Sequence, residues 1–396
     1  MLSGDNGILT KAADSKKMTE IADAKEQAQL DILSWQSERI SKGENSDLSD
    51  SRVKGILTGK SYVKTVNDSS FITASGGHEI LYSDLYKKTT PTGPKAGESG
   101  YVGGYYDDPY IPVGFEHTGN DDWNSGYTII GKTGTENAGD EFVWVPCVLD
   151  QARVKEGDTV QTFGAIYTGK YSYYGPPITD WNQGESGIAI KNSVEEFGGF
   201  YIAKYEAGIE GIKDNYTLYT ESGNDSSKLT PTTTKPLSQR GKGVWDNVSQ
   251  SDAEAISKIM VTTSLGIKSA LISGECWDTT LQWIKNTSDS SYDENSVGKG
   301  NYNEDANTNE WKGKITTTGQ LSSYVKNNIY DMAGNALERT TEYGNFNGDT
   351  YFVSRGGYYW QTDADTYPAA LRVNDTSGFD YRNSFRVVLY KEAFNS

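Results

Sequence analysis

Apolar residues near the start of the chain recur at helical spacing. The side chains that share this spacing are Ile21, Ala24, Ala28, Ile32 and Trp35. Residues three or four positions apart lie on one face of an α-helix, and lysine and glutamate fill the remaining faces. The pattern predicts one helix over residues 1–40. Periodicity alone fits an ordinary amphipathic helix or a coiled-coil segment equally well.

After this helix, the pattern changes to short β-type runs. Tyr62–Val66 and Ser70–Ala74 are predicted strands, and the glycines of Ser75–Gly77 provide a turn. We therefore expect a β-hairpin or small antiparallel sheet. His78 lies beside the turn without a second potential metal ligand near it in sequence, so we expect a solvated hairpin residue.

Proline and glycine dominate from Lys87 to Tyr106, and apolar periodicity is lost there. The chain has 396 residues, a length that favours two domains. We predict a helix-and-hairpin domain over residues 1–88, a linker over 89–106 and a second domain over 107–396.

The second domain mixes predicted strands and helices, which gives the chain an α+β fold class. Glu141–Pro146 and Gly199–Glu206 have the composition of strands. The order Ser251-Asp252-Ala253-Glu254 has the spacing of a capping box, with Ser251 as the N-cap of a helix. A further helix is predicted over Glu275–Lys285, and a long loop over Thr287–Ser323.

Composition narrows the range of partners. The net charge of −17 repels phosphate backbones, so we expect no nucleic-acid partner. The 27 tyrosines and 43 glycines are typical of adaptable binding surfaces. Loop-rich extracellular folds have the same composition, which is an equally good explanation. No apolar run is long enough to span a membrane.

The opening sequence MLSGDNGILTKAADSKKMTEIADAKEQAQLDI resembles the segment that follows the hydrophobic helix of Gram-positive type IV pilin-like proteins. In that family, a short basic leader and an apolar helix come directly before such a segment. We expect that this anchor has been removed, or lies before the chosen start. The resemblance implies a pilin-like stalk, a pilus-associated location at the cell surface or outside the cell, and contact with other pilin subunits. It also implies membrane attachment only through the absent anchor helix.

Four ordered blocks near the C-terminus resemble the formylglycine-generating-enzyme (sulfatase-modifying-factor) family. They are NNIYDMAGNALERTTE, VSRGGYYW, PAALRV and SFRVVLY, where the family reads NxYDMxGNVWEWT, RGGxW, R and GFRxV. EFVWVPC and SGECWDTTLQW resemble two earlier family blocks. The resemblance implies a C-type-lectin-like fold for residues 107–396. Leu337 and Arg339 stand where two tryptophans are usual, and Ser384 replaces a glycine.

The family's oxidase chemistry requires two neighbouring C-terminal cysteines that hold copper(I). No cysteine lies between Asn327 and Ser396, because Cys147 and Cys276 belong to other blocks. A related branch binds iron through three histidines, whereas this chain has only His78 and His117, both before the expected core. We therefore expect no enzymatic activity and no required cofactor. Whether Cys147 and Cys276 form a disulfide stays open.

The GNALERT block raises the possibility of a structural calcium ion. In the family, this segment helps to bind calcium through backbone carbonyls and a set of Asn and Glu side chains. Asn335 and Glu338 match the polar members, and Asn328 lies nearby. Calcium prefers such oxygen ligands. Alternatively, Asn335 caps a turn and Glu338 faces solvent. An unchanged melting temperature after chelation would count against calcium.

Residues 358–383, here called the variable-like segment, resemble the variable region of diversity-generating-retroelement target proteins. In those proteins, randomised adenines convert Asn codons to Tyr, Asp, Ser, Thr or His codons, but never to Lys, Glu or Met codons. The segment contains no Lys, Glu or Met, and its acidic residues are all Asp. Rigid tyrosines among short polar groups are typical of antibody-like binding sites. The candidate ligand-binding residues are Tyr358, Tyr359, Thr362, Asp363, Asp365, Tyr367, Asn374, Asp375, Asp380, Tyr381, Arg382 and Asn383.

A framework of residues is expected to hold this segment. It comprises Gly356, Gly357, Trp360, Arg372, Phe385 and Arg386, with Trp360 in the core and the two arginines as structural hydrogen-bond donors. We also expect at least one of the segment's four tyrosines to be buried.

Together, these features favour a pilin-anchored, non-catalytic binding protein at the cell surface. Its ligand would be an unidentified surface protein or glycan. A minor pilin without a variable ligand site is the second interpretation. An enzyme with altered chemistry on the same fold is the third.

Overall fold

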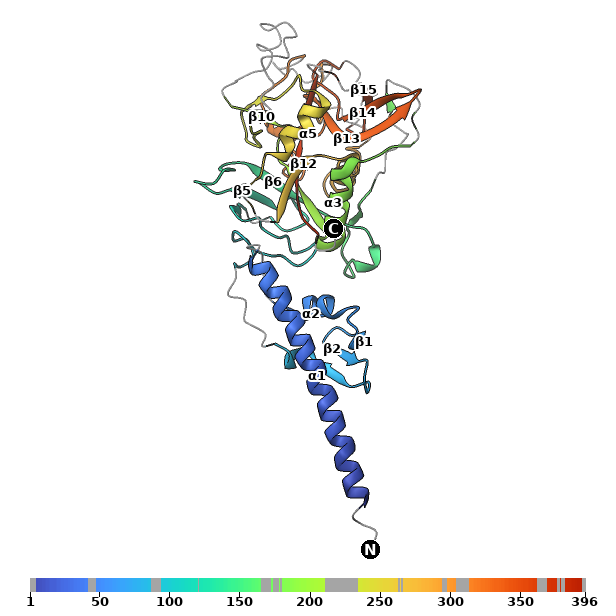
Figure 1. The fold of residues 1–396 in the computed structure, drawn as a ribbon. Helices are drawn as coiled ribbons and strands as arrows, with labels where there is room; N and C mark the ends of the chain where they lie inside the picture. Colours follow the sequence, from blue (N-terminus) through green and yellow to red (C-terminus); the bar gives the residue numbers. More distant parts are fainter. Residues whose placement is uncertain are drawn as a thin grey trace. The chain divides into compact units, whose positions relative to one another are not determined.

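In the computed structural model, the chain divides into two compact units, Met1–Pro94 and Lys95–Ser396 (Figure 1). Both units combine helices with antiparallel strands, in agreement with the predicted α+β class. The structure describes residues 5–41, 48–86, 94–119, 121–164, 172–173, 178, 180–210, 234–262, 264, 266–293, 298–303, 313–361, 369–375, 378 and 382–393.

The first unit contains the predicted helix and hairpin. Helix α1 spans Asp5–Ser41, and the shorter helix α2 spans Asp50–Leu57. Strands β1, β2 and β3 form an antiparallel three-stranded sheet. Their bounds are Val63–Val66, Ser70–Thr73 and Glu79–Leu81, and the 3-10 helix η1 follows over Tyr82–Asp84.

The apolar stripe of α1 forms one side of a small core, as its spacing predicts. Ala24, Ala28 and Ile32 are buried in a cluster that also contains Phe71 and Ile80 of the sheet. The stripe supplies the packing that a long helix in water otherwise lacks. None of the described helices is both long enough and apolar enough to cross a membrane.

His78 differs from its expected solvated state. Its Nε2 lies 3.2 Å from Oε2 of Glu20 on α1, and both side chains are largely covered. Ser75 Oγ donates a second hydrogen bond to Glu20 Oε1, at 3.1 Å. The hydrogen bond from His78 is the main reason why the pKa of Glu20 is lowered. These contacts tie the hairpin turn to the helix.

The second unit contains two main sheets. The larger has the order β12-β17-β9-β6-β5-β4, and β7 pairs with β6. Their bounds are Phe115–His117 (β4), Thr128–Gly131 (β5), Glu141–Val148 (β6), Gln161–Thr162 (β7), Gly199–Ala203 (β9), Ile267–Leu271 (β12) and Val387–Lys391 (β17). The smaller has the order β16-β13-β14-β15-β8. Its strands span Asn383–Phe385 (β16), Leu337–Phe346 (β13), Asp349–Arg355 (β14), Arg372–Asp375 (β15) and Ser172–Tyr173 (β8).

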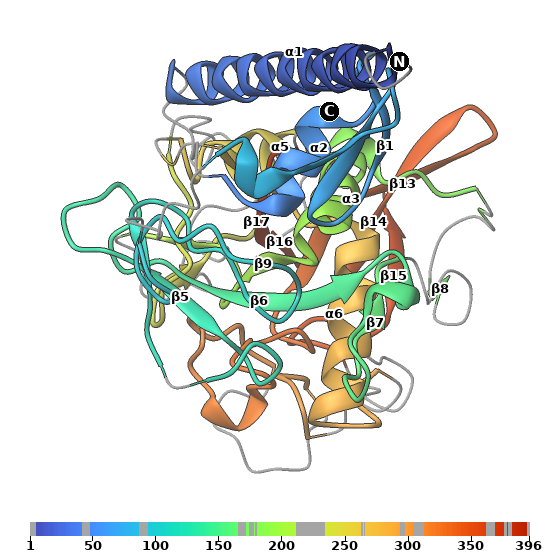
Figure 2. The same ribbon diagram turned by 90° about the horizontal axis from the view of Figure 1, so that it is seen from below.

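The remaining elements of the second unit surround these sheets. Helix α3 lies beside β9 and β13, and helix α6 lies beside β6 and β7 (Figure 2). Helix α5 lies against β12. The bounds are Gly184–Phe197 (α3), Gln250–Lys258 (α5), Gly274–Thr287 (α6), Gly208–Ile209 (β10), Gly243–Val244 (β11), Gln151–Arg153 (η2) and Ser322–Tyr324 (η4).

Strand β6 separates two apolar cores. Val143 and Val145 belong to one buried cluster, whereas Phe142 and Trp144 belong to the other. Successive strand residues point to opposite faces, so a strand that is covered on both sides contributes to both cores. This explains why the segment Glu141–Val148 is apolar at almost every position rather than at alternate positions.

The start of the second unit differs from the sequence-based prediction. Residues 95–106 belong to the second unit rather than to a linker. Tyr106 is fully buried, and its carbonyl accepts a hydrogen bond of 2.9 Å from Trp144 Nε1.

His117 lies in β4 and stacks on Tyr127 with 3.8 Å between ring centroids. The second unit therefore does contain a histidine within its sheet.

The two predicted helices are present with shifted ends. The N-cap of α5 is Ser249 rather than Ser251, and its hydroxyl accepts from Asp252 N at 3.1 Å. Helix α6 begins after Ser273, which caps it in the same way. Helix α3 was not predicted from the sequence, although its C-cap Gly198 has the left-handed conformation that ends many helices.

Candidate functional site

The variable-like segment begins at two glycines whose conformation fixes its course. Gly356 and Gly357 follow β14 with φ values of 90° and 83°, a region that side chains rarely allow. A Cβ on Gly356 would lie 3.1 Å from the Trp277 ring, and one on Gly357 would lie 2.8 Å from the Tyr302 ring. Both glycines therefore allow the backbone to approach these two rings closely, which fits their place in the expected framework.

The next residues form a hydrogen-bonded turn on this framework. Tyr359 N donates to Asn335 O at 2.9 Å, and Gln361 N donates to Tyr358 O at 3.0 Å. The Gln361 side chain closes the turn, because its Oε1 accepts from Tyr358 N at 3.2 Å. Asn303 N donates to Gln361 O at 2.9 Å and attaches the turn to a neighbouring loop.

Burial divides the aromatic residues of this turn. Tyr359 is buried in a cluster with Val244, Ile315 and Ala336, so it is a core residue and cannot be a surface anchor. The expectation that at least one tyrosine is buried is confirmed. Trp360 is 55% exposed, so its predicted place in the core is wrong. The turn points the Trp360 side chain away from the core that receives Tyr359.

The far end of the segment returns to the same sheet. Strand β16 runs parallel to β13, with Asn383 opposite Leu337. Leu337 N donates to Arg382 O at 2.9 Å. The Arg382 guanidinium lies 5.6 Å from the centroid of the Tyr358 ring, at the distance of a cation–π contact. We call Tyr358, Trp360 and Arg382 the aromatic patch.

Other candidate residues occupy different positions. Asn374 and Asn383 are buried, so their predicted place on an exposed surface is wrong. The backbone of Asp375 pairs with Phe352 in the smaller sheet. Six further candidates lie outside the described residues: Thr362, Asp363, Asp365, Tyr367, Asp380 and Tyr381.

Arg339 donates a hydrogen bond to a third position in the variable-like segment. Its side chain is fully buried. Nε donates to Val248 O at 2.8 Å, and Nη2 donates to Gly378 O within the variable-like segment. A tryptophan, the usual residue at this position in the resembled family, has only one donor. Arg339 therefore makes two hydrogen bonds, to Val248 and Gly378, whereas a tryptophan at this position could make only one.

A buried charge cluster lies below the aromatic patch. Arg386 forms a two-pronged ion pair with Glu338, at 2.8 and 2.5 Å. Glu206 accepts from Asn335 Nδ2 at 2.6 Å and from Ala336 N at 3.1 Å. Asn335 also accepts the Tyr359 backbone bond, so the cluster connects directly to the turn that carries the patch.

Burial controls protonation in this cluster. Burial raises the pKa of Asp331 to about 6 although Arg386 opposes the shift. Burial, with repulsion from Asp331 and Glu338, raises the pKa of Glu206 well above its usual range. Burial lowers the pKa of Arg386, but the surrounding carboxylates overcome this effect and raise it. The guanidinium therefore stays charged, and the surplus acids favour the protonated form.

A second buried network supports β14 and β15. Arg372 Nη2 lies 2.7 Å from Glu342 Oε1, and Arg355 Nη1 lies 3.8 Å from Glu342 Oε2. Arg355 also pairs with Asp278 of α6. Arg372 and Arg386 thus are structural hydrogen-bond donors, as predicted. Sequence reasoning missed Glu342, Asp278 and Glu206, although an acid inside an apolar stripe, such as Asp278 beside Trp277, is a usable signal.

The three calcium candidates have protein partners. Asn335 Oδ1 accepts from Asn301 Nδ2 at 3.0 Å and from the backbone N and hydroxyl of Thr316 at 2.9 and 3.0 Å. Glu338 is paired with Arg386, rather than solvent-facing. Asn328 Nδ2 donates to Gly126 O, at 2.8 Å, in another part of the unit. Within the described residues, no group of three His, Cys, Asp or Glu side chains could hold a metal ion.

Both cysteines are free, buried thiols. They belong to the same apolar cluster. Burial raises the pKa of Cys276 to about 12, and burial raises the pKa of Cys147 well above its usual value. The thiolate is the form that binds soft metals and attacks substrates, and it is scarce at such pKa values.

Comparisons with known proteins give distant structural likenesses. No family model and no curated protein matches the chain. "Treponema denticola variable protein 1" has 15% identity and a TM-score of 0.26, over 48% of this chain and 95% of that one. The structure titled "Crystal Structure of CarF" has 14% identity and a TM-score of 0.30, over 57% of this chain and 96% of that one. Scores this low leave the fold family and the function to be argued from the residues themselves.

Proposed function

We propose that this chain is a non-catalytic binding protein, displayed at the cell surface, whose second unit has a C-type-lectin-like fold of the formylglycine-generating-enzyme type. The variable-like segment provides its ligand site, centred on the aromatic patch. The ligand is a surface-exposed protein. Tryptophan, tyrosine and arginine are the residues that contribute most to protein–protein binding.

The exposure of Trp360 carries this proposal. The large Trp360 ring is 55% exposed. The two residues beside it are held by backbone hydrogen bonds, Tyr359 to Asn335 and Gln361 to Tyr358 and Asn303. Exposure of such a ring to water is unfavourable, so a partner that covers it gains free energy from apolar contact. Because these hydrogen bonds already hold the backbone, binding does not have to order it. We include Tyr358 and Arg382 in the proposed surface because they contribute a ring and a charge that contact each other.

The first unit is the proposed stalk. Its resemblance to pilin-like proteins supports attachment through a preceding anchor helix, contact with other pilin subunits and a pilus-associated location. A long helix packed on a small antiparallel sheet is compatible with this role. The absence of catalysis is supported by the raised pKa values of the two buried thiols.

A binding screen tests the ligand site. An array of purified bacterial surface and secreted proteins is probed with the wild-type chain, with Trp360→Ala and with Val113→Ala. Val113 is a matched control because it is 53% exposed in the same unit, outside the patch. We expect at least one array protein to lose binding tenfold or more in Trp360→Ala only. Equal binding by all three chains would remove the patch from the proposal and favour the minor-pilin interpretation.

A further inference from the structure

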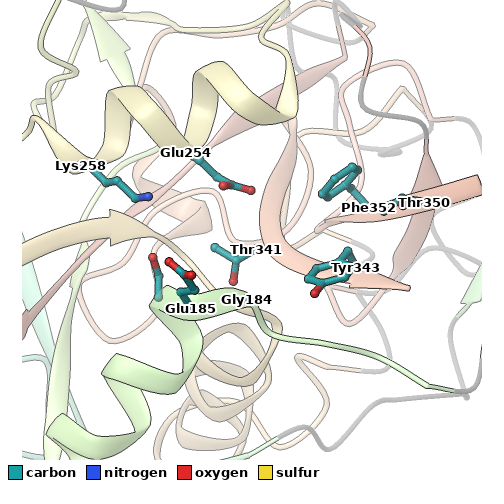
Figure 3. A pocket seen from close by; sticks show the side chains of 9 residues that line it. Gly184, Glu185, Glu254, Lys258, Thr341, Tyr343, Thr350 and Phe352 are labelled. Carbon is teal, nitrogen blue, oxygen red and sulfur yellow. The ribbon is translucent and has the colours of Figure 1, made fainter. Parts of the chain in front are cut away.

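A pocket is lined by residues that do not belong to the aromatic patch. Its volume is about 350 Å³, within the usual range of roughly 300–1,000 Å³ for small-ligand pockets. It lies between the first turn of α3, one side of α5 and the β13–β14 hairpin (Figure 3). The residues that line it include Glu185, Glu254, Lys258, Thr350, Tyr343 and Phe352.

Two rings give the pocket an apolar wall. Tyr343 and Phe352 are directly opposite residues of β13 and β14, and their ring centroids are 6.1 Å apart at an angle of 45°. Both side chains are half-buried, so part of each ring is open to the pocket. Figure 3 shows them side by side at one end of the pocket.

Three charged side chains surround the opposite end. Figure 3 shows Glu254 and Lys258 extending from α5, with Glu185 on the facing turn of α3. Within the described residues none of the three forms an ion pair, and Glu254 accepts one neutral hydrogen bond, 2.9 Å from Gln250 Nε2. Their remaining hydrogen-bonding capacity is open to a ligand.

The charges of the pocket are mixed, so an ionic ligand of either sign meets a like charge there. Two carboxylates repel an anion. Lys258 repels a cation, and so does the N-terminus of α3, whose N-cap Gln183 makes no side-chain cap. A neutral ligand with many hydroxyl groups satisfies both kinds of group, because each hydroxyl can donate to a carboxylate and accept from an ammonium.

We infer that this pocket binds an uncharged sugar residue of a glycan. One face of the sugar ring, rich in C–H groups, lies on Tyr343 and Phe352, and its hydroxyls bond to Glu185, Glu254 and Lys258. The Thr350 hydroxyl, which donates to Asn345 Oδ1 at 2.9 Å, still has lone pairs for a further contact. No metal ion is needed for this mode of recognition.

This site is separate from the aromatic patch. Leu337 of β13 contacts Arg382, whereas Tyr343 lies further along the same strand, at up to roughly 20 Å from Leu337. The sugar site therefore does not depend on the proposed protein ligand, and variants of the two sites can be tested independently.

A glycan microarray with neutral, acidic and amine-bearing glycans is probed with the full chain. We expect binding to a subset of neutral glycans and a loss of at least tenfold in Tyr343→Ala. Tyr351→Ala is the matched control, because this half-buried ring neighbours Phe352 on β14 and faces the other side of the sheet. Trp360→Ala is expected to bind the same neutral glycans as the wild type.

Glu254→Gln keeps the shape of the pocket and removes one charge. It is expected to weaken binding to the same neutral glycans three- to tenfold. If circular dichroism shows that Tyr343→Ala is unfolded, Glu254→Gln still tests the pocket. Absence of neutral-glycan binding overturns the inference. Binding restricted to acidic or amine-bearing glycans overturns it too, as does unchanged binding by both pocket variants.

Discussion

Three acids and one guanidinium share the buried interior below the aromatic patch. If Glu206, Asp331 and Glu338 were all ionised, Arg386 could neutralise only one of the three negative charges, and the others would remain buried in the interior. Such a surplus is costly, so protonation of the acids stabilises the fold. Protonation of this cluster therefore makes stability depend on pH.

Asp331→Asn tests this dependence. The folded pKa of Asp331 is about 6, above its value in the unfolded chain, so the unfolded chain releases this proton first as pH rises. The free energy of unfolding of the wild type should therefore fall between about pH 4 and pH 6, by up to about 1.4 kcal/mol per pH unit from this group. Asparagine tolerates the positive φ of 57° at this position and has no such dependence.

Urea denaturation at pH 4, 5, 6 and 7 measures the effect as the difference between the two proteins. Titrating groups that do not interact with Asp331 are common to both proteins and cancel, whereas the substitution also removes one cause of the raised pKa of Glu206. The variant should gain stability relative to the wild type as pH rises. A constant difference across this range would show that Asp331 titrates normally.

Arg339→Met tests the bond to the variable-like segment. The substitution leaves Val248 O and Gly378 O without their donor, and an unsatisfied buried group costs roughly 1–3 kcal/mol. We expect a loss of about 2 kcal/mol or more in chemical denaturation, and Arg339→Lys should not restore it, because one ammonium cannot reproduce the fork. Arg153→Met, an exposed control, should cost much less. Equal losses would contradict the assignment.

The role of a single residue was predictable where the chemistry of its side chain determines it. It was not predictable where the packing of distant segments determines whether the side chain is buried. Arg372 and Arg386 were predicted as structural donors, because buried guanidinium groups need partners. Trp360 was misplaced because a tryptophan in a glycine-rich turn can point either way. Only the hydrogen bonds of Tyr359 and Gln361 decide its direction. The buried positions of Asn374 and Asn383 depend on strand pairing between segments far apart in sequence.

At the scale of elements, periodicity and caps carried the prediction. The helix over residues 1–40, the hairpin and strand β6 all follow their patterns. Helix α3 was not predicted because Gly184 and Gly187 weaken the helical pattern of its sequence. Ile190, Val194 and Phe197 nevertheless share its buried face, and Gly198 marks its end, so the signal was present.

The start of α5 gives a direct test between two serines. Ser249 Oγ accepts from Asp252 N, so Ser249→Ala should cost about 1 kcal/mol of stability. Ser251 is exposed and lies inside the helix, so Ser251→Ala should change stability by less than about 0.5 kcal/mol. Thermal denaturation of both variants measures the difference. The reverse order would restore Ser251 as the cap.

At the scale of the whole molecule, the two units have separate cores. The first unit has its own cluster around Ala28 and Phe71, and the two largest clusters of the second unit lie on either side of β6. The boundary at Pro94 was predicted only approximately. Proline and glycine mark the sequence up to Tyr106, but that ring and its carbonyl are built into the second core.

Separate cores predict separate unfolding. Calorimetry of the whole chain should show two transitions. Removal of residues 1–94 should delete one of them and shift the other by less than about 3 °C, a shift that corresponds to roughly 1 kcal/mol in a domain of this size. A single transition that is lost or strongly shifted in the shorter chain would show that the units stabilise each other.

Gln361, in its hydrogen-bonded turn, and the buried Ala369 are two fixed points of the variable-like segment. Beyond Ala369, β15 and β16 pair on opposite sides of the β13–β14 hairpin. For a chain that joins fixed ends, the entropy of closure grows only with the logarithm of length, so doubling its length costs about 0.6 kcal/mol. A peptide library that replaces the chain between Gln361 and Ala369 would start and end on these two fixed residues, so its closure cost would rise only slowly with its length. This makes the protein a candidate scaffold for engineered binders.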